Sequence, residues 1–241
     1  IRDDVHMWAC RKTKQSFIKM GECTKKVFLT GCPSIDIAQE VLDNSKLDFD
    51  PFEKYGGVGA DINYKKGYLV VMQHPVTTEY VLARKQIEET LHAIKELNRP
   101  TFWFWPNVDA GSDGTSKGIR AFRESHDIPN THFFKNMEPT DFLKLLKNSL
   151  CLVGNSSVGI RECAYLGIPI VNIGSRQNGR ERGPNVLDVG YDREAIKQAI
   201  CKQIGNGHFP PSNIYGDGRA GIRIAQLLTE VPLTFEKILS Y

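Results

Sequence analysis

The sequence predicts an α/β protein built on a doubly wound parallel sheet. Short apolar runs alternate with amphipathic stretches along most of the 241 residues, and most of the runs are apolar at every position. A strand of that kind is buried on both faces, which is typical of parallel sheets that carry helices on each side. Strand–helix alternation with right-handed crossovers then gives the doubly wound arrangement.

Each element is predicted from its own residues. Strands are expected at 5–10, 27–30, 68–73, 101–105, 131–134, 151–153, 169–173 and 186–189, where apolar residues run together for the length of a strand. Helices are expected at 11–20, 78–97, 139–148, 158–166, 193–204, 219–228 and 233–239. Thr-Thr-Glu is the candidate cap of the second of these helices, the third begins at Pro-Thr-Asp, and Pro232 separates the last two.

The chain divides unevenly into segments. Residues 1–36 hold two predicted strands, which cannot form a stable sheet alone, so we expect the end of an N-terminal domain whose remainder is absent. Residues 37–66 contain Pro51 and several glycines without clean periodicity and are expected to form a linker or loop. Residues 67–228 carry a full strand–helix alternation and are expected to form the second domain, with a C-terminal helix in 229–241. Because the first residue is Ile1 rather than Met, we expect a piece of a longer protein.

Composition excludes several classes of function. The 31 basic and 28 acidic residues leave a net charge of +3 without a long basic run, which argues against a nucleic-acid or membrane binder. The six cysteines form no CxxC pair, which argues against a zinc cluster and favours free thiols in a reducing compartment. Neither a long apolar stretch nor a signal-peptide pattern is present, so we expect a cytoplasmic location.

Ligands of doubly wound folds bind beyond the carboxyl ends of the strands, so the segments that follow the strands form the candidate site. His74 directly follows a strand and can contact a phosphate or transfer a proton, although a lone His is more often a satisfied polar residue. Asn107 follows another strand, in a segment that is also typical of an ordinary turn.

Two further segments are suited to anions. Ser156 and Ser157 follow a strand and can cap the next helix while leaving amides free for phosphate, and Glu162 can accept hydrogen bonds from sugar hydroxyls. The alternative is plain capping with an exposed Glu. The loop that starts at 174 holds three arginines, including Arg176, and three glycines, which favours anion binding by at least one Arg.

The absence of GxGxxG, GxxxxGK[ST] and GxSxG argues against a nicotinamide dehydrogenase, a P-loop NTPase and an α/β-hydrolase. A glycine-poor phosphate site with an acidic residue inside the following helix fits a nucleotide-sugar enzyme better.

Six segments carry the most specific signal. They are Gly-Cys-Pro-Ser-Ile-Asp (31–36), Gln-His-Pro-Val-Thr-Thr-Glu (73–79), Pro-Asn-Val-Asp-Ala-Gly-Ser (106–112), Gly-Asn-Ser-Ser-Val-Gly-Ile-Arg-Glu (154–162), Gly-Ser-Arg-Gln-Asn-Gly-Arg-Glu (174–181) and Ile-Tyr-Gly-Asp-Gly (214–218). Together they resemble the UDP-N-acetylglucosamine 2-epimerase family, and its hydrolysing branch most. The non-hydrolysing branch usually carries Arg-Arg-Glu-Asn after the equivalent of His74, whereas this chain has Pro-Val-Thr-Thr-Glu.

The resemblance implies a glycosyltransferase-B-like fold of two Rossmann-like domains with the active site between them. This chain would be the second, UDP-binding half, with a last helix that packs back toward the first domain. Carried over position by position, the resemblance implies UDP contacts at His74 (diphosphate), Asn107 (nucleotide side of the cleft), Met137 (uracil, through its backbone), Ser156 and Ser157 (phosphate), Glu162 (ribose) and Arg176 (the same pocket).

The implied reaction converts UDP-GlcNAc and water to N-acetylmannosamine and UDP, for sialic-acid, nonulosonate or surface-polysaccharide precursors. UDP leaves C1, the C2 proton is removed, and water adds to the glycal. The carboxylates of this family lie mainly in the first domain, so we expect this chain alone to bind UDP without turnover. No metal and no cofactor are expected, and the full-length enzyme is expected to be a homodimer or homotetramer.

Other functions stay open. They are a hydrolysing epimerase of a UDP-diacetamido sugar, a non-hydrolysing UDP-GlcNAc 2-epimerase, a glycosyltransferase of the same fold, and a non-catalytic UDP-binding module. Asp113 stands where the animal relatives carry a basic residue for feedback by CMP-sialic acid, so we expect that regulation to be absent.

Overall fold

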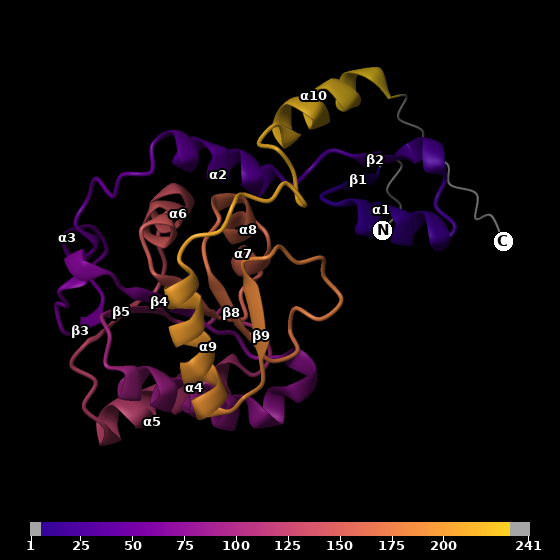
Figure 1. Ribbon diagram of the computed structural model, residues 1–241. Helices are drawn as coiled ribbons and strands as arrows, with labels where there is room; N and C mark the ends of the chain where they lie inside the picture. Colours follow the sequence, from indigo (N-terminus) through magenta and orange to yellow (C-terminus); the bar gives the residue numbers. More distant parts are fainter. Residues whose placement is uncertain (1–5, 232–241) are drawn as a thin grey trace.

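The computed structural model describes residues 6–231, which form two sheets and their surrounding helices (Figure 1). The smaller sheet pairs β1 (His6–Trp8) in parallel with β2 (Val27–Leu29), and α1 (Arg11–Lys19) connects them. The strands of the larger sheet are β3 (Val58–Gly59), β4 (Leu69–Met72), β5 (Thr101–Phe104), β6 (Thr131–Phe134), β7 (Cys151–Gly154), β8 (Ile170–Ile173) and β9 (Val186–Val189). The remaining helices are α2 (Pro33–Asp43), α3 (Pro51–Tyr55), α4 (Ala83–Leu97), α5 (Ser112–Ser125), α6 (Pro139–Lys147), α7 (Ser157–Ile160), α8 (Glu162–Leu166), α9 (Arg193–Asn206) and α10 (Ala220–Glu230).

The larger sheet confirms the predicted α/β class. In the described residues its seven strands have the order β3-β6-β5-β4-β7-β8-β9, and all pairs are parallel except β3 with β6. The chain moves outward from β4 through β5 and β6, then returns to place β7 on the other side of β4. The strand order therefore reverses between β4 and β7, which is where doubly wound sheets open a crevice for ligands.

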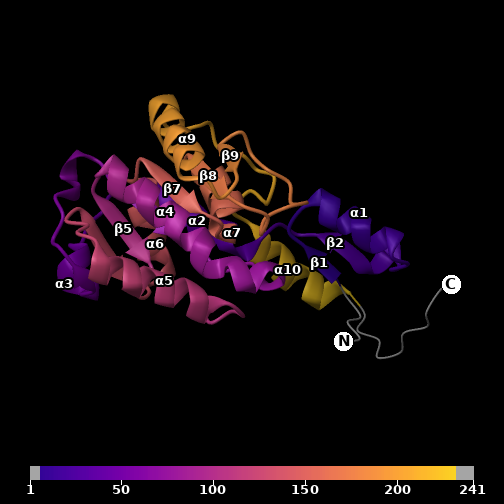
Figure 2. The same cartoon turned by 90° about the horizontal axis from the view of Figure 1, so that it is seen from below.

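Helices cover both faces of this sheet (Figures 1 and 2). The face under α2, α6 and α8 buries Val70, Phe102 and Phe134, whereas the face under α4, α5 and α9 buries Val71 and Trp103. Neighbouring residues of one strand thus point into different cores, as the period of two in a strand requires. Because both faces are buried, the apolar runs predicted strands without alternation.

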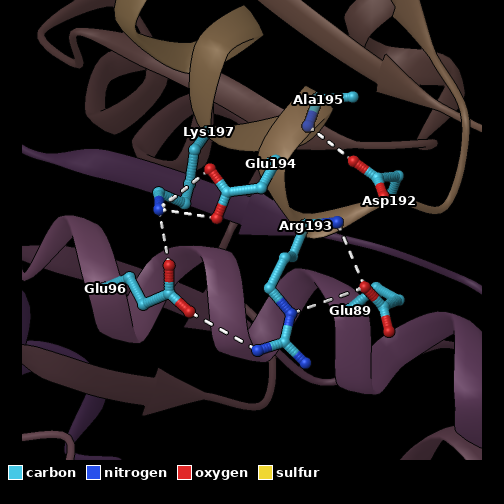
Figure 3. Close-up of polar contacts among 7 residues, drawn as sticks. All are labelled: Glu89, Glu96, Asp192, Arg193, Glu194, Ala195 and Lys197. Carbon is cyan, nitrogen blue, oxygen red and sulfur yellow. Dashed lines mark hydrogen bonds and ion pairs between the residues drawn. The ribbon is translucent and has the colours of Figure 1, made fainter.

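A cluster of charged side chains joins α4 to α9 on one face of the sheet (Figure 3). Glu96 accepts from Lys197 at 2.5 Å and pairs with Arg193 at 3.5 Å, and Glu89 accepts from the backbone N–H of Arg193 at 3.1 Å. Asp192 caps α9 by accepting from the Ala195 N–H at 2.8 Å. A network of this kind holds two helices in register more effectively than one exposed ion pair.

Four helical segments differ from the sequence predictions. The α-helix expected at 78–97 begins at Ala83, and Thr77–Leu82 before it form a 3₁₀ segment without a side-chain cap. The expected linker at 37–66 contains α3 and most of α2, and α2 buries Ile35, Ala38 and Val41 in the core that it shares with α6 and α8. Helix α5 was not predicted at all. The single helix expected at 158–166 is broken at Arg161, whose ψ is −76°.

The last part of the chain is described only to residue 231. Helix α10 confirms the helix expected near 219–228. The helix predicted at 233–239, and with it most of 229–241, lies outside the described residues. No helix within 6–231 is long and apolar enough to span a bilayer.

Candidate functional site

The candidate site lies where β4 and β7 end side by side. The side chain of Asn155, which follows β7, accepts from the His74 backbone N–H at 2.7 Å and donates to the His74 carbonyl at 2.8 Å. Its own backbone N–H donates to Met72 at 3.1 Å. Asn155 is fully buried. These bonds lock the ends of the two strands together, so the residues that follow them have fixed positions.

Gly154 makes this close approach possible. Its φ of +132° lies in a region that side-chain-bearing residues avoid. A Cβ at this position would also collide with the Met72 carbonyl oxygen. The glycine in the Gly-Asn-Ser-Ser segment is therefore required by the junction of β4 and β7.

His74 is a neutral hydrogen-bond donor at this junction. Its Nδ1 accepts from the Asn107 backbone N–H at 3.1 Å, so the proton of the neutral ring is on Nε2. Burial of the ring, and next the Arg176 cation, lower the pKa of His74 from 6.5 to about 4, against the opposing effect of Asp109. At neutral pH the ring can donate through Nε2 without carrying a charge.

Arg176 extends from the loop after β8 to the same place. Its Nη1 donates to the Asn155 carbonyl at 3.2 Å, and the Gln177 side chain donates to the same carbonyl at 2.7 Å. Its Nη2 lies 3.5 Å from a carboxylate oxygen of Asp109. The guanidinium remains partly exposed, with 28% of its side chain accessible. It is thus held in place while still able to bind an anion.

A polar hollow of about 630 Å³ opens in front of these groups. Its lining includes Thr77, Thr78, Glu79, Asp109, Ser157 and Arg176. The hollow therefore collects hydroxyls, two cations (Arg176 and Arg180) and two carboxylates from the segments that follow four parallel strands.

The helix segment after β7 is built differently from the prediction. Ser156 caps α7 by accepting from the Val158 N–H at 3.4 Å, but α7 is only one turn long before Arg161 interrupts it. Arg161 then donates to the Ser157 hydroxyl at 3.4 Å. An anion at this place would be bound by hydroxyls and individual amides rather than by the dipole of a long helix.

Glu162 is buried rather than exposed, with 5% of the residue accessible. Its Oε1 lies 3.4 Å from Arg161, and its Oε2 has no hydrogen-bond partner within the described part of the chain. Burying a carboxylate oxygen without a donor is costly, and such groups concentrate at functional sites. The exposed-Glu alternative is therefore wrong, and Glu162 has the chemistry needed to accept from a ligand hydroxyl.

The structure brings most of the predicted site residues together. His74, Asn107 and Arg176 are linked through Asn155 and Asp109, and Ser156, Ser157 and Glu162 follow on the adjoining turn. Met137 is separate, because it follows β6, two strands away from β4, and its side chain is buried in the core.

Sequence reasoning missed Asn155, Asp109 and Gln177. Only their place in the motifs at 106–112, 154–162 and 174–181 could have indicated them. Within residues 6–231 no group of three or more His, Cys, Asp or Glu side chains is arranged to hold a metal ion.

Comparison with known proteins identifies the family of this chain. Residues 3–229 match the family model described as UDP-N-acetylglucosamine 2-epimerase, and the chain belongs to this family. A Legionella pneumophila relative named UDP-N,N'-diacetylbacillosamine 2-epimerase (hydrolyzing) is 32% identical over 95% of this chain and 58% of its own length. A Neisseria meningitidis relative named UDP-N-acetylglucosamine 2-epimerase is 26% identical over 89% of this chain and 54% of its own length.

Solved structures confirm the fold. The UDP-GlcNAc 2-epimerase from Neisseria meningitidis bound to UDP-GlcNAc superposes with a TM-score of 0.72 at 17% identity, covering 95% of this chain and 62% of that one. This chain therefore spans between 54% and 62% of the length of these three proteins.

Proposed function

We propose that this chain provides the UDP-binding half of a hydrolysing UDP-N-acetylglucosamine 2-epimerase. One observation carries the proposal: the partly exposed Arg176 and Ser157 line a polar hollow, and the neutral His74 donor lies at the adjoining junction of β4 and β7. A diphosphate needs such a set of donors and one cation, all fixed in advance.

Each group has a role in the departure of UDP. Arg176 offsets the negative charge that develops on the diphosphate when the C1–O bond breaks, and its contact with Asn155 fixes its position beforehand. The Nε2–H of His74 donates to a phosphate oxygen. The buried carboxylate of Glu162 accepts from the ribose hydroxyls, which supply the donor that Oε2 lacks within the described residues.

The chemistry at C2 needs a base that the polar hollow does not offer. Asp109 pairs with Arg176, and the carboxylate of Glu79 accepts from Ser175 and Gln86. Neither carboxylate of the hollow is thus free to remove a C–H proton. We propose that this step uses carboxylates outside these 241 residues, and that the chain alone binds UDP without releasing it from UDP-GlcNAc.

The substrate of the whole protein is proposed to be UDP-GlcNAc or a UDP-diacetamido sugar. The names of the relatives in Legionella pneumophila and Neisseria meningitidis support one substrate each. The Pro-Val-Thr-Thr-Glu segment after His74 supports the hydrolysing reaction in either case.

Calorimetric titration with UDP tests the proposal. We expect binding in the micromolar to millimolar range, weakened about 10- to 100-fold in Arg176→Ala because a charge-assisted contact is lost. Ser156→Ala and Glu162→Ala are expected to weaken it as well. Arg84→Ala is the matched control, since Arg84 is an exposed cation that pairs with Glu88 on α4.

Two results would contradict the proposal. One is the same affinity in Arg176→Ala and in the control. The other is rapid formation of UDP from UDP-GlcNAc by this chain alone, which would show that the base is already present.

A further inference from the structure

We propose that Glu79 is a positioning residue that connects the loop carrying Arg176 to the end of β4, where His74 lies. The inference rests on the proposed UDP site and assigns a task to a residue that does not itself meet the diphosphate. Glu79 lies five residues after His74, inside the 3₁₀ segment Thr77–Leu82, and lines the hollow.

Both carboxylate oxygens of Glu79 are engaged. The hydroxyl of Ser175, the residue before Arg176, donates to Oε1, and the Gln86 side chain donates to Oε2 at 2.7 Å. Among the residues that the structure describes, no Lys or Arg pairs with this carboxylate. The carboxylate therefore accepts hydrogen bonds from two neutral donors, one on the β8–β9 loop and one on α4.

The contacts continue inward to β4. The Gln86 backbone carbonyl accepts from the Gln73 side chain at 3.5 Å, and Gln73 in turn accepts from the Thr90 hydroxyl at 2.6 Å. Gln73, Gln86 and Thr90 are all buried. Since Gln73 directly precedes His74, this buried network extends from the residue beside Arg176 to the residue beside His74.

The loop reaches Glu79 in a constrained conformation. Gly174 has a φ of +75°, and a Cβ there would collide with the ring and hydroxyl of Tyr191. Its N–H donates to Val189 at 2.8 Å, so the start of the loop is fixed on β9. Ser175 is the next residue, and its bond to Glu79 decides in which direction the chain continues toward Arg176. Positioning of this kind determines how well a cation meets its anion.

The test uses binding of UDP and of uridine, which lacks the diphosphate. We expect Glu79→Ala and Ser175→Ala each to weaken UDP binding about 5- to 10-fold and to leave uridine binding unchanged. Glu79→Gln is expected to retain most of the affinity, because an amide can still accept from Gln86 and the Ser175 hydroxyl can accept from its NH₂ group. Glu88→Ala, which removes an exposed carboxylate of α4, is the matched control.

A double-mutant cycle separates positioning from general destabilisation. If Glu79 acts through Arg176, Glu79→Ala has no further effect in the Arg176→Ala background. Additive losses, equal losses for uridine, or an affinity that rises when the charge is removed would each overturn the proposal.

Amide hydrogen exchange tests the role of Glu79 without relying on UDP binding. Failure of the wild-type chain to bind UDP would refute the UDP site itself. In that case faster amide exchange of residues 174–183 in Glu79→Ala would still support the proposal that Glu79 holds this loop in place. Unchanged exchange would overturn it. Normal UDP binding in Glu79→Ala, with weakened binding in Arg176→Ala, would overturn the role of Glu79 alone.

Discussion

Protonation of His74 should destabilise the folded chain in mild acid. In the unfolded chain His74 has an ordinary pKa near 6.5, whereas in the folded chain burial and the Arg176 cation lower it to about 4. Between these values the unfolded state binds more protons, so the free energy of unfolding falls as the pH falls. The two pKa values give a loss of about 2 kcal/mol at pH 5 and about 3 kcal/mol below pH 4.

Urea denaturation of the wild type and of His74→Asn between pH 7.5 and pH 4.5 measures this loss. Asn places an uncharged acceptor near the position of Nδ1, so the contact with the Asn107 N–H is kept in part. Carboxylates and the other histidines titrate in both proteins, and the difference between the two curves isolates His74. We expect the variant to lose about 2 kcal/mol less than the wild type on going from pH 7.5 to pH 5.

Parallel curves would refute the reasoning. They would show that His74 has the same pKa in both states, and therefore that the ring is neither as buried nor as close to the Arg176 cation as the structure places it. The assignment of Nε2–H as a neutral donor to phosphate would then fail with it.

Three further predictions concern the same junction. Asp109→Asn should raise UDP affinity about 2- to 5-fold in calorimetry, because Arg176 loses a partly exposed competing partner; unchanged or weaker binding would contradict this. Glu162→Gln should stabilise the free chain by about 1 kcal/mol in urea denaturation, because the amide removes a buried, incompletely paired charge, and it should weaken UDP binding. A loss of stability in this variant would show that the charge of Glu162 is well compensated. Gly154→Ala should destabilise the chain by about 2–4 kcal/mol through strain and collision with Met72, and an unchanged denaturation midpoint would be inconsistent with that close approach.

The parallel strands could be predicted because the pattern that identifies each strand lies within a few consecutive residues. The run 102–104 is apolar at every position, which is typical of a strand buried on both faces. Strand β3 could not be found in this way, because Val58 and Gly59 are exposed and join the sheet through backbone bonds. Helix α5 was hidden by Gly114 and Gly118, which have poor helix propensity.

The site could be predicted only in part for a related reason. The position of His74 at a strand end is visible along the chain, and the arginines of the 174–183 loop are visible as a cluster. Asn155 and Glu79 reveal their roles only through partners 81 and 96 residues away. Glu162 was found as a candidate, but its burial follows from the break at Arg161, which no propensity indicates.

The strand order also sets a sequence of events in folding. Strands β4, β5 and β6 are consecutive in the chain, as are β7, β8 and β9, so each half of the sheet can assemble from nearby segments. Among the paired strands of this sheet, β4 and β7 are the farthest apart in the chain, with His74 and Asn155 separated by 81 residues. Closing the β4–β7 seam therefore costs the most loop entropy within the sheet. We therefore expect the seam to close last. Because the proposed UDP site is built on that seam, neither half contains it, and the time at which refolding chains gain UDP affinity would mark the completion of the fold.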